Sequence, residues 1–322
     1  MAGLANTFRD RCDALVNELK KVIVGHDDAV RMMCAAFFSG GHVLIEGVPG
    51  LGKTLLAASF ARATSLEFKK IQFTPDLMPA DITGTHVIVE KDGGRVLEFR
   101  KGPLFANFVL ADEINRATPK TQSALLEGMQ ERCVTAGRET MPLPEPFMVL
   151  ATQNPVEMKG TYPLPEAQQD RFAFKVIVAP ADAAGMAEIL RRTTGVEVPA
   201  VKPVLDRAAV LDMARLLREV VVSPHIRELA ARVVMLTCPT FPDAPEPVRR
   251  FVRLGASIRG GQALIAAAQF AALMDGQVNA TAVGVTAHIL PALRHRLILS
   301  FEAGADGVTP DAVLAAVAKA LQ

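Results

Sequence analysis

Apolar residues in the first 195 positions form two kinds of segment that alternate along the chain. Short and almost continuously apolar runs predict buried strands at residues 42–46, 68–73, 108–111, 147–152 and 172–178. Apolar residues spaced three and four apart predict helices at residues 8–21, 27–39, 53–64 and 118–130. Alternating strands and helices are typical of a parallel sheet covered on both faces. The pattern therefore predicts an α/β fold for this part of the chain.

Two β-hairpins are predicted outside this alternation. Residues 86–90 and 95–99 are strand-like and flank a turn at residues 91–94 that contains Asp and two glycines. Residues 133–141, with Gly137 in the middle, predict a second, smaller hairpin. Prolines and a glycine within residues 75–84 predict an irregular loop before the first hairpin.

The strand pattern ends after Pro180. Residues 196–204 contain two prolines and are interpreted as a linker. Only helical periodicity appears after the linker, at residues 206–221, 224–236, 257–274, 281–292 and 309–321. The chain of 322 residues is also longer than one hydrophobic core normally supports. We therefore expect two domains, an α/β domain at residues 1–195 and an all-helical domain at residues 206–322.

Charge and composition disfavour several classes of protein. Lys and Arg number 35 against 34 Asp and Glu, and this balance argues against a general attraction to nucleic acid or anionic membrane, though not against a local patch. The segment 263–274 is too short to span a bilayer, and the N-terminus lacks the apolar run of a secretion signal. Four scattered cysteines favour free thiols over disulfides or zinc. We expect a cytoplasmic protein without nucleic-acid partners or membrane insertion.

The most specific motif is the segment Gly47-Val48-Pro49-Gly50-Leu51-Gly52-Lys53-Thr54, which fits the phosphate-binding P-loop pattern G-x-x-x-x-G-K-[ST]. The glycines allow successive N–H groups to surround the phosphates. Lys53 supplies a positive charge for the β and γ phosphates, and Thr54 supplies a hydroxyl for Mg²⁺. The motif lies between a predicted buried strand and a predicted helix, whose N-terminal dipole also favours phosphate. A structural turn does not require Lys followed by Thr, so we predict nucleotide binding.

Two acidic residues follow the predicted strand 108–111. Asp112 and Glu113 lie at the carboxyl end of a predicted strand, where parallel sheets commonly bind their ligands. Asp112 is expected to hold Mg²⁺ through water, and Glu113 to polarise the attacking water. This pair fits hydrolysis better than phosphoryl transfer to a second substrate.

Three further polar residues have ambiguous roles when each is considered alone. Asn154 follows the strand 147–152 and could hold water or the γ-phosphate, but Asn-Pro is also a common turn former. Arg171 and Arg259 could each stabilise transferring phosphate, but isolated arginines are more often surface or salt-bridge residues.

Taken together and in order, these motifs resemble those of the AAA+ ATPases, and more closely those of the MoxR family. The runs that carry the resemblance are residues 47–54, 110–117, 121–127, 151–155 and 162–172 in the first domain and 255–259 and 293–296 in the second. The resemblance implies a P-loop parallel sheet between helices, followed by a small all-α lid domain. It also implies ATP and Mg²⁺ as cofactors and ATP hydrolysis as the activity.

The resemblance implies roles for the ambiguous residues. Asn154 matches the sensor 1 residue, and Arg171 matches the arginine finger that reaches the nucleotide of the neighbouring subunit. Arg259 matches the sensor 2 arginine of the lid, which contacts the γ-phosphate. The residues implied in nucleotide binding are Val24, Gly25, His26, Gly47, Val48, Pro49, Gly50, Leu51, Gly52, Lys53, Thr54 and Leu55.

The same resemblance implies an assembly and a partner. Members of the family usually form hexameric rings and act as chaperone-like remodellers, and their usual partners carry a von Willebrand factor type A domain. The two predicted hairpins match insertions that point toward the central pore of such rings. Two positions depart from the family pattern, namely Ile258 where Pro is common and Gln169 where Leu is common. Neither departure touches the predicted catalytic groups.

Other functions stay open at this point. The chain could be a metal-insertion motor similar to the AAA+ subunit of magnesium chelatase. It could also be a nucleotide-gated binding module with little turnover. A nucleic-acid motor is disfavoured by the near-zero net charge and by the absence of Trp.

Overall fold

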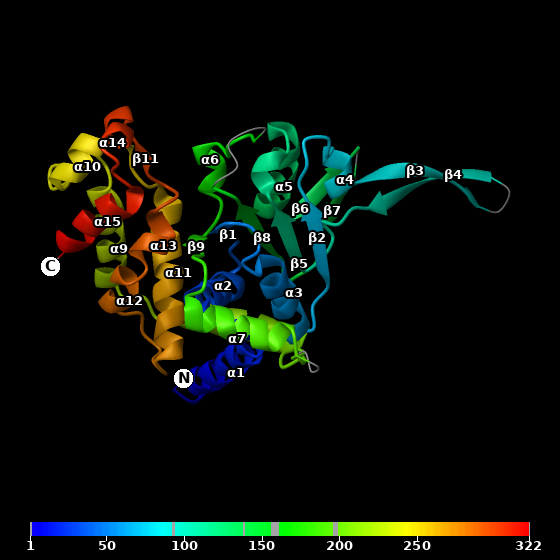
Figure 1. The fold of residues 1–322 in the computed structure, drawn as a ribbon, viewed down its shortest axis with the longest axis horizontal. Coiled ribbons are helices and arrows are strands. Elements are labelled where there is room, and N and C mark those ends of the chain that lie inside the picture. The colour runs from blue at the N-terminus through cyan, green and yellow to red at the C-terminus, as the bar shows by residue number, and fades with distance from the viewer. Residues whose placement is uncertain (1, 92–93, 138, 156–160, 196–198, 322) are drawn as a thin grey trace.

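The fold is described from a computed structural model, which covers residues 2–91, 94–137, 139–155, 161–195 and 199–321. Figure 1 shows a central sheet with helices on both sides, a helical part at the left that ends at the C-terminus, and a two-stranded ribbon that projects at the right. Among the described residues, no helix has both the length and the apolar character that a membrane span requires.

The central sheet is parallel, as the sequence predicts. Its strand order is β2-β5-β8-β1-β9. The strands are β1 (Val43–Glu46), β2 (Phe68–Gln72), β5 (Phe108–Asp112), β8 (Met148–Gln153) and β9 (Phe174–Ile177). Every pairing between neighbours is parallel, so all five strands end at the same edge of the sheet. We call this edge the carboxyl edge, and we call the edge at which the strands begin the amino edge.

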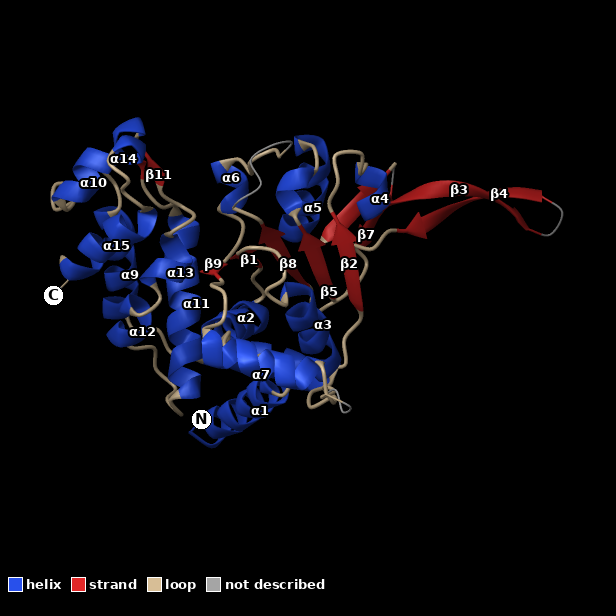
Figure 2. Ribbon diagram, in the orientation of Figure 1, coloured by secondary structure: helices blue, strands red, loops and turns tan. Residues whose placement is uncertain are grey.

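The helices of the α/β part cover both faces of the sheet (Figures 1 and 2). Their bounds are α1 (Ala2–Lys20), α2 (Asp27–Ser39), α3 (Lys53–Ala63), α4 (Pro79–Thr83), α5 (Pro119–Glu131), α6 (Glu166–Gln169) and α7 (Ala183–Thr193), with a 3-10 turn η1 (Ile114–Arg116). Successive residues of β5 point to opposite faces, since Phe108 and Leu110 join the core under α2 and α3 whereas Val109 and Ala111 join the core under α5. Residues 183–193 form a helix that the apolar pattern did not predict.

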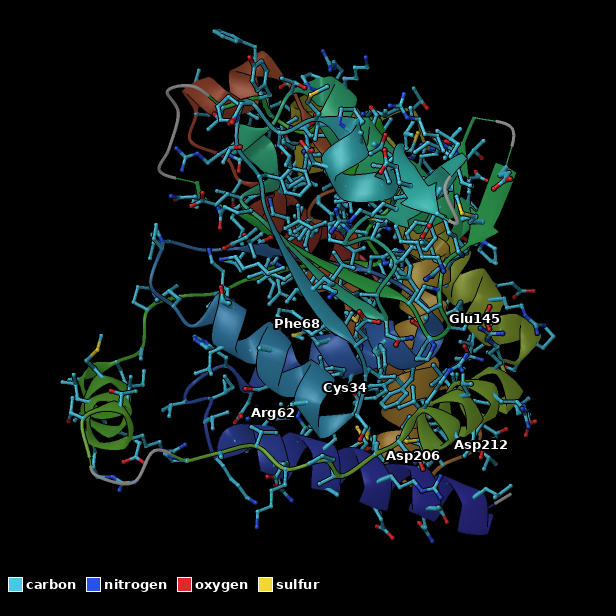
Figure 3. All side chains as sticks on the ribbon, turned by 90° about the vertical axis from the view of Figure 1, so that its right-hand side faces the viewer. Cys34, Arg62, Phe68, Glu145, Asp206 and Asp212 are labelled. Carbon is cyan, nitrogen blue, oxygen red and sulfur yellow. The ribbon has the colours of Figure 1, made fainter. Side chains whose placement is uncertain are left out.

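The core beneath the sheet is rich in aromatic side chains and thiols. Phe37 packs edge-on against Phe60, and the ring of Phe60 lies 5.3 Å from that of Phe108. Figure 3 shows Cys34 inside this layer of helices. Cys12 and Cys34 are free and buried, and hydrogen bonding between them together with burial raises the pKa of the Cys34 thiol well above its usual value.

Both predicted hairpins are present. Strands β3 (Gly84–Lys91) and β4 (Gly94–Lys101) pair antiparallel and project from the body (Figure 2), while β6 (Cys133–Ala136) pairs with β7 (Glu139–Pro142). The turn positions 92–93 and 138 lie outside the described residues. The β3–β4 ribbon exposes the apolar side chains of Ile88, Val96 and Leu97.

The C-terminal part is mostly helical. Its helices are α8 (Arg207–Glu219), α9 (Pro224–Leu236), α10 (Glu246–Phe251), α11 (Ile258–Met274), α12 (Ala282–Thr286), α13 (Ile289–Leu293), α14 (Phe301–Ala305) and α15 (Pro310–Lys319). The segment predicted as one helix at residues 281–292 is divided into α12 and α13. A short antiparallel ribbon of β10 (Val252–Leu254) and β11 (Ile298–Leu299), which the sequence did not predict, lies beside α14.

The two parts of the chain share one apolar core. Helices α8 and α11 pack against α1 and α2, and α13 packs against β9, the edge strand of the sheet. The residues of this continuous core come from both sides of the expected linker. The expected linker at residues 196–204 is described only from residue 199, and the domain boundaries stay a prediction.

Candidate active site

The P-loop connects the end of β1 to the first turn of α3, at the carboxyl edge. Gly50 and Gly52 have φ angles of 84° and 73°, in the left-handed region that favours glycine. A Cβ atom at Gly47 would lie 2.8 Å from the carbonyl oxygen of Val178, so this position also requires glycine for steric reasons. The resulting loop places the N-terminus of α3, with its unpaired N–H groups and its positive dipole end, at the mouth of the site.

Lys53 extends back across this loop. Its ammonium group donates a hydrogen bond to the carbonyl of Gly47 at 2.6 Å. Partial burial lowers the pKa of Lys53, while the nearby charges of Asp112 and Glu113 act in the opposite direction. Lys53 therefore lies within electrostatic reach of both predicted acids. Thr54, one residue further along α3, has an exposed side chain.

Asp112, the last residue of β5, is held by side chains from both neighbouring strands. Its Oδ1 accepts a hydrogen bond from the Thr152 hydroxyl at 2.7 Å, and its Oδ2 lies 2.7 Å from Nζ of Lys70. These partners fix the carboxylate at the carboxyl edge. Together with the hydroxyl of Thr54, it provides the hard oxygen ligands that Mg²⁺ prefers.

Glu113 has an unusual backbone conformation. Its φ of 56° and ψ of 50° are left-handed, which is uncommon outside glycine and is often found at functional sites. The Thr152 hydroxyl accepts a hydrogen bond from the backbone N–H of Glu113 at 2.8 Å and so supports this turn. The side-chain oxygen Oε2 accepts hydrogen bonds from Gln72 and Arg116, each at 3.0 Å. Sequence reasoning missed both partners, because neither belongs to a motif.

Asn154 lies at the same edge, after β8. Strand β8 pairs with β1 in the register Glu46 to Gln153, and the N–H of Gly47 donates to the carbonyl of Gln153 at 3.2 Å. Asn154, the next residue, is buried with 5% of its surface exposed. The structure therefore brings Lys53, Asp112, Glu113 and Asn154 together around the P-loop.

A mainly apolar cavity adjoins the P-loop on the side of α7. Its volume is about 280 Å³, and Val24 and His26 line it together with Gly50 and Leu55. Met186 and Ile189 of α7 complete the wall. Gly25 lines a neighbouring cavity together with His26. The cavity has the apolar character that suits a nucleotide base, and the contribution of α7 could not be predicted from a motif.

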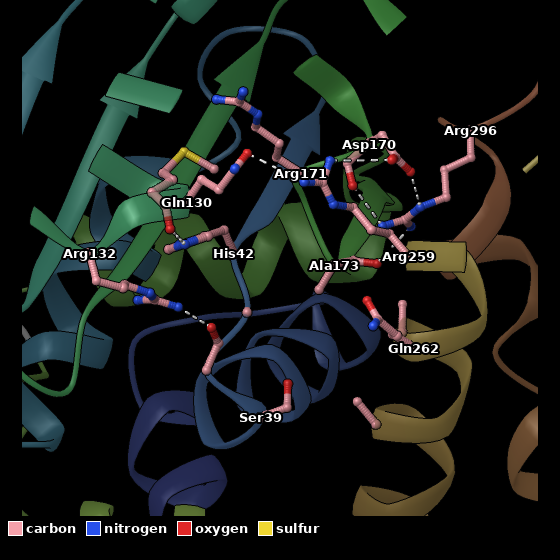
Figure 4. A pocket seen from close by; sticks show the side chains of 15 residues that line it. Ser39, His42, Gln130, Arg132, Asp170, Arg171, Ala173, Arg259, Gln262 and Arg296 are labelled. Carbon is pink, nitrogen blue, oxygen red and sulfur yellow. Dashed lines mark hydrogen bonds and ion pairs between the residues drawn. The ribbon is translucent and has the colours of Figure 1, made fainter. Parts of the chain in front are cut away.

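Arg171 and Arg259 lie together at the other side of the sheet. Both line a cavity of about 410 Å³, shown in Figure 4, that is also bounded by residues 39–42, which lead into β1. Arg171 itself lies three residues before β9. Because residues 39–42 and 171 precede parallel strands, the cavity lies at the amino edge. The structure thus does not bring Arg259 to the P-loop of its own subunit.

This cavity, which we call the arginine pocket, has an excess of positive charge. Arg132, Arg171, Arg259 and Arg296 line it, and Asp170 is the one carboxylate among its described lining residues. The guanidinium of Arg132 donates to the carbonyls of Phe147 and Gly40, and burial lowers its pKa. Nε of Arg171 is buried and has no hydrogen-bond partner among the described residues. The pocket is therefore suited to bind an anion.

The chain is similar in sequence and in fold to several known proteins. Residues 42–174 match a family described as "ATPase family associated with various cellular activities", and residues 248–317 match the AAA lid domain. Chaperone MoxR1 of Mycobacterium tuberculosis is 44% identical over 92% of this chain and 78% of its own length. Protein MoxR of Methylorubrum extorquens is 30% identical over 97% of this chain and 95% of its own length. A crystal structure of a protein from Cytophaga hutchinsonii, assigned as an ATPase, superposes with a TM-score of 0.92 at 36% identity and covers 99% of this chain and 96% of that one.

Proposed function

The chain belongs to the MoxR family of AAA+ ATPases, and we propose that it hydrolyses ATP at sites shared between the subunits of a homo-oligomeric ring. One observation carries the proposal. The P-loop, Asp112 and Glu113 lie at the carboxyl edge of the sheet, whereas Arg171 lies at the amino edge. These positions support a site whose two halves lie at opposite edges of the sheet in one subunit and are joined by a second subunit.

The carboxyl edge would bind the nucleotide and perform hydrolysis. Backbone N–H groups of the P-loop and the ammonium of Lys53 hold the phosphates, and Asn154 orients the γ-phosphate or the attacking water. Glu113 polarises that water. Thr54 and Asp112 are the residues that would hold Mg²⁺, which when bound neutralises charge on the phosphate oxygens.

The amino edge would act on the nucleotide of the neighbouring subunit. Arg171, in the role of an arginine finger, adds positive charge where negative charge develops on the transferring phosphate. The sequence analysis assigned only Arg171 to the neighbour and took Arg259 as the lid arginine that contacts the γ-phosphate of its own subunit, and the distance of Arg259 from its own P-loop corrects this expectation. The place of Arg259 beside Arg171 supports a contact with the nucleotide of the neighbour.

We further propose that hydrolysis remodels or activates a partner protein. The relative from Mycobacterium tuberculosis is named a chaperone, which supports this role. A hexameric ring and a partner with a von Willebrand factor type A domain complete the proposal. The β3–β4 ribbon, with Ile88, Val96 and Leu97 exposed, would face the pore of such a ring.

Mixed rings test the shared site. The Glu113→Gln and Arg171→Ala variants should each be inactive alone, because the first lacks the group that activates water and the second lacks the finger. An equimolar mixture should regain part of the ATPase activity, since the intact Arg171 of one variant faces the intact Glu113 of the other. A mixture that forms rings but stays inactive would refute the shared site.

The partner is tested separately. The Glu113→Gln variant with ATP should retain its partner in a pull-down, because nucleotide binding persists without turnover. Recovery of a protein with a von Willebrand factor type A domain supports the proposal, whereas recovery of DNA overturns it.

A further inference from the structure

Asp170, the residue directly before Arg171, is bound by three groups of the lid. Its Oδ1 accepts a hydrogen bond from Nε of Arg296 at 2.9 Å. Its two oxygens lie 2.8 and 2.9 Å from the hydroxyl of Ser257, and its Oδ2 lies 3.5 Å from Nη1 of Arg259. Figure 4 shows Asp170, Arg259 and Arg296 meeting at the end of the arginine pocket. Among the described residues, the hydrogen-bond partners of the carboxylate next to the proposed arginine finger therefore come from the lid.

Arg296 also binds the backbone on both sides of Arg171. Its Nη2 donates to the carbonyls of Asp170 and Phe172 at 3.1 and 2.7 Å. Its Nη1 donates to the carbonyl of Ala173 at 3.1 Å and to that of Ala292 in the lid. The Arg296 side chain is only 2% exposed. One buried guanidinium thus joins helix α13 to the segment 170–173, which carries the finger.

The neighbouring histidine adds a parallel contact. Nε2 of His295 lies 2.9 Å from the carbonyl oxygen of Phe172. Burial, and next the charge of Arg296, lower the pKa of His295 well below its usual value, so the ring is neutral and donates a hydrogen bond to this carbonyl. The histidine therefore reinforces the attachment without adding charge to the pocket.

Close packing within the lid holds these groups against one another. A Cβ atom at Gly260 of α11 would lie 2.7 Å from Cδ2 of Leu293 and 3.2 Å from Cδ of Arg296. Helix α11, which begins just after Ser257, is thus in tight contact with α13 and with the stem of Arg296. A shift of the lid relative to the sheet would displace Ser257, Arg259 and Arg296 as one unit.

We propose that Arg296 and Asp170 are positioning residues that attach the arginine finger to the lid, so that the position of the lid sets where Arg171 stands in the neighbouring site. This inference rests on the proposed function, since it assumes that Arg171 acts on the nucleotide of the neighbour. It goes further by naming the residues through which the lid of one subunit controls hydrolysis in the next.

The test is complementation by the Asp170→Asn variant. A misplacement of about 1 Å can lower a rate ~10²-fold, so we expect kcat to fall by about 10- to 100-fold. The KM for ATP and the binding of a fluorescent ATP analogue to the P-loop of the variant should stay unchanged. Mixing with Glu113→Gln subunits should restore activity, because they supply an intact finger. Mixing with Arg171→Ala subunits should restore none, because neither variant then supplies a correctly placed finger.

Two further variants separate positioning from stability. Asp311→Asn breaks an Arg–carboxylate pair of 2.9 and 3.0 Å with Arg294 inside the lid, away from the finger, and should leave kcat unchanged. Arg296→Lys keeps the buried charge but removes the planar fork, and it should repeat the complementation pattern of Asp170→Asn. It provides the same test if Asp170→Asn does not fold.

The outcomes are distinguishable. Full activity of both Asp170→Asn and Arg296→Lys would overturn the inference. Failure of Glu113→Gln to restore a folded variant, while it restores Arg171→Ala, would overturn the positioning role and leave the shared site intact. Failure to restore Arg171→Ala in intact rings would refute the shared site itself, and the inference with it.

Discussion

The two edges of the central sheet hold the groups that we propose to bind phosphate in two different ways. At the carboxyl edge, the functional groups come from segments that directly follow strands, and backbone N–H groups share the work with Lys53. At the amino edge, the groups are guanidiniums that come from the C-cap of α5, from the segment before β9 and from the lid. The first edge is organised locally and the second by tertiary packing. Activity that needs both edges must depend on how subunits meet and on how the lid sits.

The edges also differ in charge. At the carboxyl edge the carboxylates of Asp112 and Glu113 are paired with Lys70 and Arg116 and lie near Lys53, whereas the arginine pocket has four guanidiniums and one described carboxylate. An excess of positive charge in a partly buried pocket favours an anionic partner. The γ-phosphate of a nucleotide on the neighbouring subunit has the required charge, so the two edges are electrostatically complementary.

Loss of Arg171, the proposed arginine finger, should reduce this complementarity most. Arg171→Ala should lower the ATPase rate of assembled rings by ~10³–10⁵, the range known for arginine fingers. Nucleotide binding to the P-loop should persist, because the carboxyl edge is unchanged. Steady-state ATPase assays and binding of a fluorescent ATP analogue provide the two measurements. The matched control is Arg232→Ala on the exposed surface of α9. A decrease in the ATPase rate of less than tenfold would show that the arginine pocket does not take part in catalysis.

The complementary change acts on the carboxyl edge. Glu113→Gln removes the group that polarises water and should lower the ATPase rate by ~10²–10⁴, with ATP binding retained. Unlike Arg171→Ala, this variant should still supply an active finger to its neighbours. Glu127→Gln, on the exposed face of α5, is the control. Turnover at the wild-type rate would show that Glu113 does not polarise the attacking water.

The same contrast explains what could be predicted from the sequence. The P-loop and the acidic pair are contiguous runs after strands, so local pattern could locate them. It could not show that the side chains of Lys70, Gln72, Arg116 and Thr152 contact the two acidic residues. The sheet followed from the alternation of apolar runs. The β10–β11 ribbon and the association of Arg259 with Asp170 depend on contacts between distant segments, which no local pattern encodes. Helix α7 differs, because Asp182 caps its N-terminus and Met186, Ile189 and Leu190 have helical spacing, so the local signal for it was present but missed.

Packing at the amino edge can be perturbed without touching an arginine. A Cβ atom at Gly41 would lie 2.7 Å from Cβ of Ala173, where β9 begins after the finger. Gly41→Ala should therefore destabilise the protein by about 1–3 kcal/mol through overpacking. Gly304→Ala, where no atom lies within 4 Å, is the matched control. Urea unfolding measures both, and equal stability of Gly41→Ala and the wild type would contradict the close packing.

The amino edge should also make stability depend on pH. His42 is buried between α5 and β8, and burial together with the charge of Arg132 lowers its pKa from 6.5 to about 3. As pH falls below about 6.5 the unfolded chain binds a proton that the folded chain excludes, so stability should fall by about 1.4 kcal/mol per pH unit toward pH 3. His42→Gln should reduce this slope, measured by urea unfolding between pH 6.5 and 5. An unchanged slope would show that His42 does not contribute.

The smallest expected effect concerns how the carboxyl edge restrains its own catalytic carboxylate. Gln72 and Arg116 both donate to Oε2 of Glu113, and a carboxylate held in this way is less able to polarise water. Gln72→Ala removes a bond from a neighbouring strand and leaves the charge pair with Arg116 intact. The basal ATPase rate should rise several-fold in the absence of any partner protein, whereas Gln277→Ala, an exposed change in the lid, should leave it unaltered. A lower rate in Gln72→Ala would mean that this bond orients Glu113 for catalysis. Any restraint on the basal ATPase rate would then have to come from the amino edge alone.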